Sequence, residues 1–355
     1  MKTLKSKLKF FFHLHLVLFL FIVITMTGCK SASPPTFVVA WMANGGNITS
    51  MESSDGTNWF NRTVHHTSLT DDKGPAIAHD DRLNWMLMWK NGPELQYNIG
   101  IGGIVVDSAT VKGIQWSNAS SIGKLNVLPD GSPSVAYGNG RWVVVFRNGV
   151  HLKVVRTQNN STTSWETPVA VFHQDIVPRP ATTSRDPAIG FGKVNGQDVF
   201  VLVYKAENSS EALASISEDG LIWSVPQVIG FVENDPAIAV SKDRIYVLLA
   251  RSAGSGKRNF LFESLDGVSW TLIDELSGAA LFITGPAFAL GRDTAIITEV
   301  SSATTKIVSR IGKVTNGNSL RFGPHNFLRL DGSSIIENVA NPSTRTALHF
   351  GKKAK

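Results

Sequence analysis

Short apolar runs recur along the chain about every 50 residues, separated by polar segments rich in glycine and proline. The runs are continuous and rich in β-branched and aromatic residues, which is the pattern of strands buried on both faces. Strong helical periodicity is absent from the segments between them. The pattern therefore predicts an all-β protein. Its apolar runs are residues 37–42, 85–89, 142–146, 199–204, 245–250 and 295–298.

A polar sequence, S-x-D-G-x-x-W, recurs in phase with these runs. Its Ser and Asp side chains can hydrogen-bond nearby backbone N–H groups, its Gly can take the positive φ of a tight turn, and its Trp starts the next strand with a buried ring. Three copies are complete, at residues 53–59, 217–223 and 264–270, and three are degenerate. The aromatic residues that end the six copies are Trp59, Trp116, Trp165, Trp223, Trp270 and Phe322.

A second repeated segment, with Pro at its second position and usually Ala at its third, precedes the apolar runs at residues 74–78, 132–136, 186–190, 235–239 and 285–289. Each repeat then consists of an inner strand with this segment, the apolar strand, a more polar strand and a fourth strand that begins at the aromatic anchor. Four antiparallel strands per repeat form the blade of a β-propeller. The sequence predicts a six-bladed β-propeller over residues 36–355.

The first repeat lacks its own inner strand, because it opens directly at the apolar run of residues 37–42. Residues 341–350 follow the sixth anchor and form a segment of the kind that is missing. We expect them to complete blade one, so that N- and C-terminal strands close the ring and remove two exposed sheet edges.

The S-x-D-G-x-x-W turns resemble the Asp-box, or BNR, repeats of sialidases and related propellers, and the likeness covers nearly all of the chain after residue 35. The resemblance implies a sialidase-like propeller in which Asp55, Asp219 and Asp266 are structural, because the Asp-box lies on the face away from the ligand site. That family includes glycosidases, binding proteins and assembly factors. The Arg-Ile-Pro motif of sialidases is absent, so no catalytic set can be transferred residue by residue.

The N-terminus has the pattern of a targeting signal. Four lysines among the first nine residues precede an apolar run over residues 10–26, and Gly28-Cys29 follows. This arrangement resembles a bacterial lipoprotein signal, which implies a signal peptide over residues 1–28, lipidation of Cys29 and a tether over residues 29–35. The lipid bilayer is then a partner, and the protein faces the periplasm or the cell exterior from the bacterial envelope. An ordinary signal peptide and an uncleaved anchor are the alternatives.

Composition narrows the function classes further. Cys29 is the sole cysteine, so the chain has no internal disulfide and no thiolate metal cluster. The net charge of +6 includes the four N-terminal lysines, so the rest of the chain carries about +2 and contains no basic run suited to nucleic acid. Phosphate-binding and dinucleotide-binding motifs are absent, and no histidines have the spacing of metal ligands. We therefore expect no cofactor, no metal and no nucleic-acid partner.

Charged residues end the apolar strands and precede the inner strands, and in a blade these two places share one rim. Arg suits a carboxylate, phosphate or sulfate, Lys adds a point charge, and paired carboxylates could position sugar hydroxyls or serve as acid and base. We expect these side chains to ring one mouth of the central channel, with two tryptophans stacking on a sugar. The predicted ligand-binding residues are Lys90, Arg147, Lys205, Arg251, Arg185, Trp41 and Trp89, and the predicted catalytic acids are Asp186, Asp235 and Glu299.

Three functions fit this sequence. The first is a membrane-anchored propeller that binds a carbohydrate or another anionic ligand at the channel mouth. The second is an exo-acting glycoside hydrolase of sialidase-like design. The third is a scaffold or assembly factor that binds a protein partner and does not depend on the chemistry of the mouth.

Overall fold

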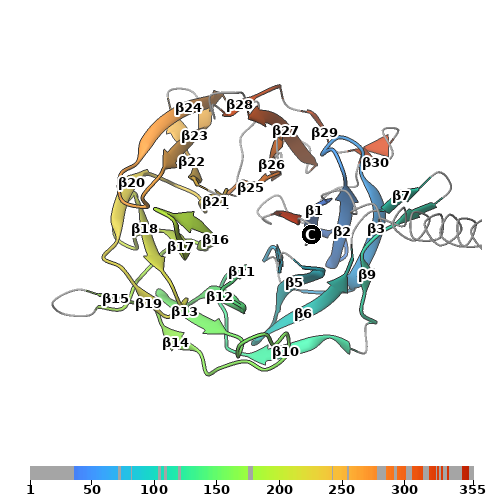
Figure 1. Ribbon diagram of the computed structural model, residues 1–355, viewed down its shortest axis with the longest axis horizontal. Helices are drawn as coiled ribbons and strands as arrows, with labels where there is room; N and C mark the ends of the chain where they lie inside the picture. The colour runs from blue at the N-terminus through green and yellow to red at the C-terminus, as the bar shows by residue number, and fades with distance from the viewer. Residues whose placement is uncertain are drawn as a thin grey trace, which may run out of the picture. The chain divides into compact units, whose positions relative to one another are not determined.

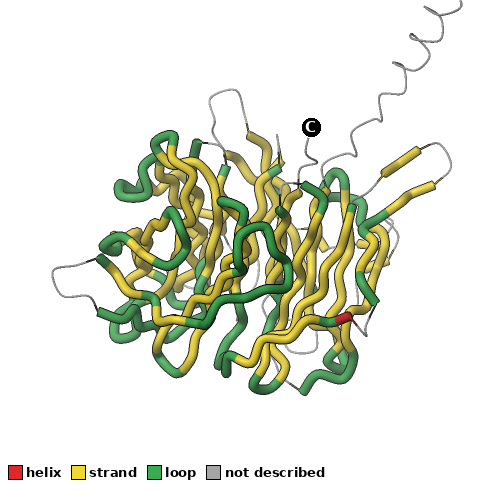
Figure 2. The backbone as a smooth tube through the Cα atoms, turned by 60° about the horizontal axis from the view of Figure 1, so that its bottom comes forward, coloured by secondary structure: helices red, strands yellow, loops and turns green. Residues whose placement is uncertain are grey.

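Six sheets follow one another around a common axis in the computed structural model and form a six-bladed β-propeller, as predicted (Figure 1). Figure 2 shows the strands running side by side between two rims, where turns and loops connect them. The inner strands of successive blades contact one another around the whole axis, including those of the sixth blade and the first.

The structure describes residues 36–351 except 71–72, 81, 103–104, 108–109, 119–120, 175–178, 242, 254–255, 278–284, 292–293, 301–305, 315–319, 325, 328, 331–333 and 336–345. The predicted signal peptide, Cys29 and the tether lie outside these residues. All described residues belong to one unit, residues 34–354. None of the described residues forms a helix that is long and apolar enough to span a membrane.

The blades share one plan of four layers, counted outward from the axis. The inner strands of blades one to six are β32 (Ala347–Gly351), β4 (Ala76–His79), β11 (Ser134–Gly138), β16 (Ala188–Val194), β21 (Ala237–Val240) and β25 (Ala287–Leu290). The second strands are β1 (Thr36–Ala43), β5 (Asn84–Asn91), β12 (Arg141–Asn148), β17 (Gln197–Lys205), β22 (Ile245–Ala253) and β26 (Thr294–Val300). The third strands are β2 (Asn47–Ser53), β6 (Glu94–Ile101), β13 (His151–Arg156), β18 (Glu211–Ser217), β23 (Gly256–Ser264) and β27 (Ile307–Val314).

The outer layer is less regular than the inner three. It consists of β3 (Phe60–His66), β9 (Gln115–Trp116), β10 (Gly123–Asn126), β14 (Val169–Ala170), β20 (Gln227–Phe231), β24 (Thr271–Ser277), β28 (Leu320–Phe322) and β29 (Asn326–Phe327). Three further strand pairs lie outside the blade plan. They are β7 (Val105–Asp107) with β8 (Thr110–Lys112), β15 (Phe172–His173) with β19 (Ile222–Trp223), and β30 (Arg329–Leu330) with β31 (Ser334–Ile335).

Blade one is closed by the two ends of the described chain. β32 pairs antiparallel with β1, so that Thr36 lies opposite Gly351 and Ala40 opposite Ala347. β1 in turn pairs with β2, which pairs with β3. The predicted closure is therefore confirmed, and each apolar run of the sequence is the second strand of its blade.

The hydrophobic core lies between blades rather than within them. The buried residues form six clusters, and each cluster joins two neighbouring blades. Each aromatic anchor packs between its own blade and the preceding one: Trp223 of blade four is fully buried against blade three. Trp165 of blade three packs against blade two and donates its Nε1–H to the Tyr97 hydroxyl at 3.1 Å. The anchors recur because every interface between blades needs one large ring.

The inner strands fit together by alternating small and large side chains. Ala76 and Ala78 of β4 share a cluster with Val135 of β11, and Ala237 and Ala239 of β21 share one with Phe288 of β25. Small residues on one face of these inner strands thus accept the large residue of the next blade. This packing explains why the repeated inner-strand segment alternates Ala with Ile, Val or Phe.

The three complete S-x-D-G-x-x-W turns have the same hydrogen bonds. In the first copy, Ser53 Oγ accepts the Gly56 N–H at 2.8 Å, and Asp55 Oδ1 accepts the N–H groups of Thr57 and Asn58 at 2.8 and 2.9 Å. The turns at Asp219 and Asp266 repeat this arrangement. The glycines take φ values of +79°, +79° and +73°, which disfavour a residue with a Cβ.

Candidate functional site: the basic arc and the axial cavity

Three of the predicted cations hold equivalent positions on consecutive blades. The first residues of β4, β11 and β16 lie opposite Met88, Val145 and Val203 of their second strands. Lys90, Arg147 and Lys205 each follow two residues later, so their side chains leave the same face of their sheets. We call Lys90, Arg147 and Lys205, with the neighbouring Arg185, the basic arc. It lies at the rim where the inner strands begin.

Arg251 and Glu299 do not continue the arc, which corrects the prediction that four cations and Glu299 share one position. Ala237 lies opposite Leu248 and Ala287 opposite Thr298. Arg251 therefore comes one residue too late and Glu299 one residue too early, and both leave the opposite face of their sheets. The Arg251 guanidinium carbon lies 4.0 Å from the ring centroid of Phe260, in its own blade.

Arg147 is held by the loops around it. Its Nη1 donates to the Gly149 carbonyl at 3.0 Å and its Nη2 to the Asp130 carbonyl at 3.3 Å. Its Nε is 3.8 Å from Asp186 Oδ1, beyond hydrogen-bond distance, and this nitrogen is buried without a hydrogen-bond partner among the described residues. Arg147 thus has a fixed guanidinium with one donor that its protein neighbours leave unused.

Lys205 and Arg185 bring two positive charges together at the rim of blade four. Lys205 Nζ donates to Ser184 Oγ at 3.0 Å and to the Ser209 carbonyl at 2.6 Å. Burial and the charge of Arg185 lower the pKa of Lys205. Neither residue forms an ion pair within the described part of the chain. Two cations without a carboxylate between them create a local excess of positive charge that favours an anion.

Asp186 and Asp235, two of the predicted acids, link neighbouring blades. Asp186 Oδ2 accepts the N–H of Ser132 in blade three, and Asp235 Oδ1 accepts the N–H of Asp186 in blade four, both at 2.9 Å. Ser132 Oγ accepts the N–H of Gly74 in blade two at 3.0 Å. Three residues before an inner-strand proline thus bond their counterparts in the preceding blade: Ser132, Asp186 and Asp235. Ser132 also belongs to this row of hydrogen bonds between blades. The sequence did not single it out as a site residue, although it occupies the same position in its repeat as Asp186 and Asp235.

Glu299, the third predicted acid, is buried between blades five and six with 2% of its surface exposed. Its Oε1 accepts a hydrogen bond from Asn259 Nδ2 of blade five. Burial raises the pKa of Glu299 to about 7, although the Asn259 hydrogen bond and the charge of Arg310 oppose this rise. The carboxyl therefore belongs to the interface between blades.

Trp41 and Trp89 are both fully buried, with exposed fractions of 0%. Trp41 packs between blades six and one, and Trp89 between blades one and two. They are the structural equivalents of Glu299, because each follows the residue paired with the start of its inner strand. The predicted stacking on a sugar does not fit this placement, because no ring face is accessible.

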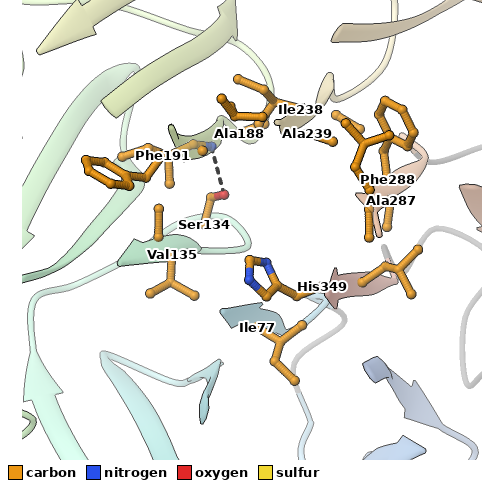
Figure 3. Close-up of a pocket in the computed structure, with 18 of the residues that line it drawn as sticks. Ile77, Ser134, Val135, Ala188, Phe191, Ile238, Ala239, Ala287, Phe288 and His349 are labelled. Atoms are coloured by element: carbon orange, nitrogen blue, oxygen red, sulfur yellow. Dashed lines mark hydrogen bonds between the residues drawn. The ribbon is translucent and has the colours of Figure 1, made fainter. Parts of the chain in front are cut away.

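A cavity of about 440 Å³ runs along the axis, walled by the inner strands of all six blades (Figure 3). Its wall consists mainly of Ala, Ile, Val, Leu and Phe side chains. Its charged lining residues are Lys193 and Asp198, which form an ion pair at 2.8 Å. The described lining does not include any of the predicted ligand-binding or catalytic residues. The basic arc and the axial cavity are therefore two separate places on the protein.

Comparison with known proteins supports the fold. A variant of the Aleuria aurantia lectin in complex with Fucalpha1-6GlcNAc has a TM-score of 0.52 at 12% identity, covering 84% of this chain and 93% of the lectin. An alpha-L-arabinofuranosidase from Lactobacillus brevis has a TM-score of 0.45 at 13% identity, covering 71% and 95%. The NanB sialidase from Streptococcus pneumoniae has a TM-score of 0.36 at 11% identity, and the match covers 86% of this chain and 63% of the sialidase. No protein-family model and no curated protein matches the sequence. The likeness to the lectin supports the β-propeller architecture and nothing finer.

Proposed function

We propose that this protein is a ligand-binding β-propeller that recognises an anionic ligand, most simply an acidic carbohydrate, through the basic arc. The observation that carries the proposal is the register: Lys90, Arg147 and Lys205 repeat at one position on three consecutive blades. Repetition of this kind lines up cations from distant parts of the chain along one rim. The carbohydrate part of the proposal draws on the Aleuria aurantia lectin, a structure of similar fold in complex with Fucalpha1-6GlcNAc.

The charges of the arc fit a carboxylate, sulfate or phosphate group. Arg185 and Lys205 share no carboxylate partner among the described residues. An anion bound here would accept hydrogen bonds from the Arg185 guanidinium and be attracted by the neighbouring charges of Lys205 and Arg147. Binding is favoured over hydrolysis because the three predicted acids bond backbone or amide groups between blades.

We also propose that the S-x-D-G-x-x-W turns are Asp-box repeats and that Cys29 carries a lipid anchor. The support for the first is the shared hydrogen bonding of the three complete turns. The support for the second is the sequence of residues 1–29. The propeller would then be held at a membrane of the bacterial envelope, facing the periplasm or the exterior. Metabolic labelling of the expressed chain with a palmitate analogue tests this, and a Cys29→Ala chain that still takes up label contradicts it.

A glycan array with sialylated, sulfated, uronic-acid and neutral members tests the proposed ligand class. The wild-type chain should bind acidic members, and Arg185→Glu should weaken binding at least tenfold, because this exposed residue can be reversed without disturbing the core. Arg82→Glu is the matched control. Arg82 is also exposed but follows β4, at the opposite rim.

The outcomes separate the three functions. Loss of binding in Arg185→Glu with retention in Arg82→Glu supports the arc. Binding to acidic glycans that survives both charge reversals contradicts it. Absence of glycan binding together with capture of a protein partner favours the scaffold function, and cleavage of the bound glycans favours the hydrolase.

A further inference from the structure

The inner strands reveal one residue that breaks the sixfold pattern. The third residue of the inner strand is small in five blades: Ala78, Ala136, Gly190, Ala239 and Ala289. In blade one the same register position is occupied by His349, which lies two residues after Ala347. A large polar ring thus stands where the other blades need a small residue to accept the next blade.

The His349 ring lines the axial cavity as a result. Figure 3 shows it pointing into the open space between the inner strands, with Ile77 beside it. Its centroid is 6.0 Å from that of Trp85 in an edge-on contact. Its nitrogens make no hydrogen bond within the described part of the chain, whereas the cavity-lining hydroxyl of Ser134 already accepts the Ile189 N–H at 3.0 Å.

The charges of the cavity favour an uncharged ligand. An ion would meet a wall whose charges, Lys193 and Asp198, already neutralise each other. Burial lowers the pKa of His349 to about 3, so the ring is neutral and offers one donor and one acceptor. Apolar side chains make up most of the lining, and His79, Ser134, Tyr137, Ser241 and Thr346 add further polar groups. A cavity with many apolar and a few polar groups is typical of a small-molecule site.

We propose that the axial cavity binds an uncharged small molecule whose hydroxyl or carbonyl group hydrogen-bonds the imidazole of His349. This site is distinct from the basic arc and does not depend on the proposed glycan function. A molecule with one or two fused rings is compatible with a cavity of about 440 Å³.

The uncharged naphthyl ketone prodan tests the proposal with the full chain, because its emission shifts to the blue in an apolar site. The wild-type chain should bind it. His349→Phe keeps a ring of similar size but loses the hydrogen bond, and should bind about fivefold to tenfold more weakly. His349→Trp should weaken binding by narrowing the cavity. His349→Ala introduces the side chain that four other blades carry, so it should fold and show the same loss of the hydrogen bond.

Two controls separate this site from others. Phe231→Ala removes a ring that is 55% exposed on the outer strand β20, and should leave prodan affinity unchanged. Arg185→Glu should leave it unchanged as well, while it weakens glycan binding. In the wild-type chain, the imidazole nitrogen signals of His349 should shift on saturation with prodan, a readout that needs no variant. Equal prodan affinity in the wild type, His349→Phe and His349→Ala, or imidazole signals that do not move, would overturn the proposal.

Discussion

Two groups of aspartates lie at opposite rims of the propeller and stabilise different levels of its structure. Asp55, Asp219 and Asp266 follow the third strands, and each accepts two backbone N–H groups of its own turn. Asp186 and Asp235 precede inner strands, and each accepts a backbone N–H group from the neighbouring blade. The same side chain thus completes a turn at one rim and joins two blades at the other.

The two groups differ in how far along the sequence their hydrogen-bond partners lie, and this separates local structure from contacts between repeats. The turn aspartates and their partners lie two or three residues apart. Asp186 and Asp235 lie 54 and 49 residues from their partners along the sequence, which is close to the length of one repeat. Bonds of the second kind need a neighbouring blade, whereas the backbone hydrogen bonds of the turns lie within one hairpin. Asp219 adds to its turn a contact at 3.3 Å with Arg156 of blade three.

Opening the ring should have the largest effect and gives the strongest test of that contrast. Deletion of residues 341–355 removes β32, leaves β1 with an unpaired edge and exposes the buried residues that it covers. We expect a loss of at least about 5 kcal/mol, comparable to the whole stability of many domains. Thermal unfolding followed by circular dichroism measures it. A truncated chain with an unchanged melting temperature would show that the ring is not closed by this strand.

Removal of one blade-to-blade carboxylate should cost about 3 kcal/mol, the upper end for leaving a buried donor unsatisfied. Asp186→Ala leaves the N–H of Ser132, a residue that is 2% exposed, without its acceptor and removes the nearby charge partner of Arg147. Urea unfolding measures the change. Asp186→Asn retains an acceptor oxygen and serves as the matched control, with a smaller loss. If Asp186→Ala instead keeps full stability and abolishes cleavage of a glycan, the residue is catalytic and the contrast fails.

Glu299 is a third kind of acidic residue in this structure, because its carboxyl is buried between two blades. Its pKa is raised from 4.5 to about 7, so the folded protein binds more protons than the unfolded chain between those values. The stability that this group contributes is full below about pH 4.5 and is lost as the pH rises to about 7. Glu299→Gln does not titrate, so its stability relative to the wild type should rise by about 2 kcal/mol between pH 5 and pH 8.

Urea unfolding of both chains at the two pH values measures this difference. Glu275→Gln is the control, because Glu275 is half-exposed and pairs with Arg258 at the surface. A constant difference between wild type and Glu299→Gln across the pH range would mean that the carboxyl is not buried in this way.

The sequence predicted the blade architecture well because repetition is visible without any contact being known. The apolar runs, the three complete turns and the missing inner strand of blade one all follow from spacing, and the structure confirms each. The site was predicted less well. Arg251 and Glu299 looked equivalent to Lys90 and Arg147, but strand register differs by one residue between blades, and that difference reverses the face. Trp41 and Trp89 end buried strands, and sequence position alone does not show whether a neighbouring blade covers them.

The smallest effect should come from a turn aspartate. Asp219→Ala removes the acceptor of the Leu221 and Ile222 N–H groups and a contact at 3.3 Å from Arg156. Its side chain is 43% exposed, so water can replace most of these bonds, and we expect a loss of about 1 kcal/mol in urea unfolding. Gly220→Ala in the same turn should cost more, because it places a Cβ 2.7 Å from Val143 of blade three at a φ of +79°. If Asp219→Ala instead lowers the free energy of unfolding as much as Asp186→Ala does, its contact with Arg156 of blade three holds neighbouring blades together. The two groups of aspartates would then have the same structural role.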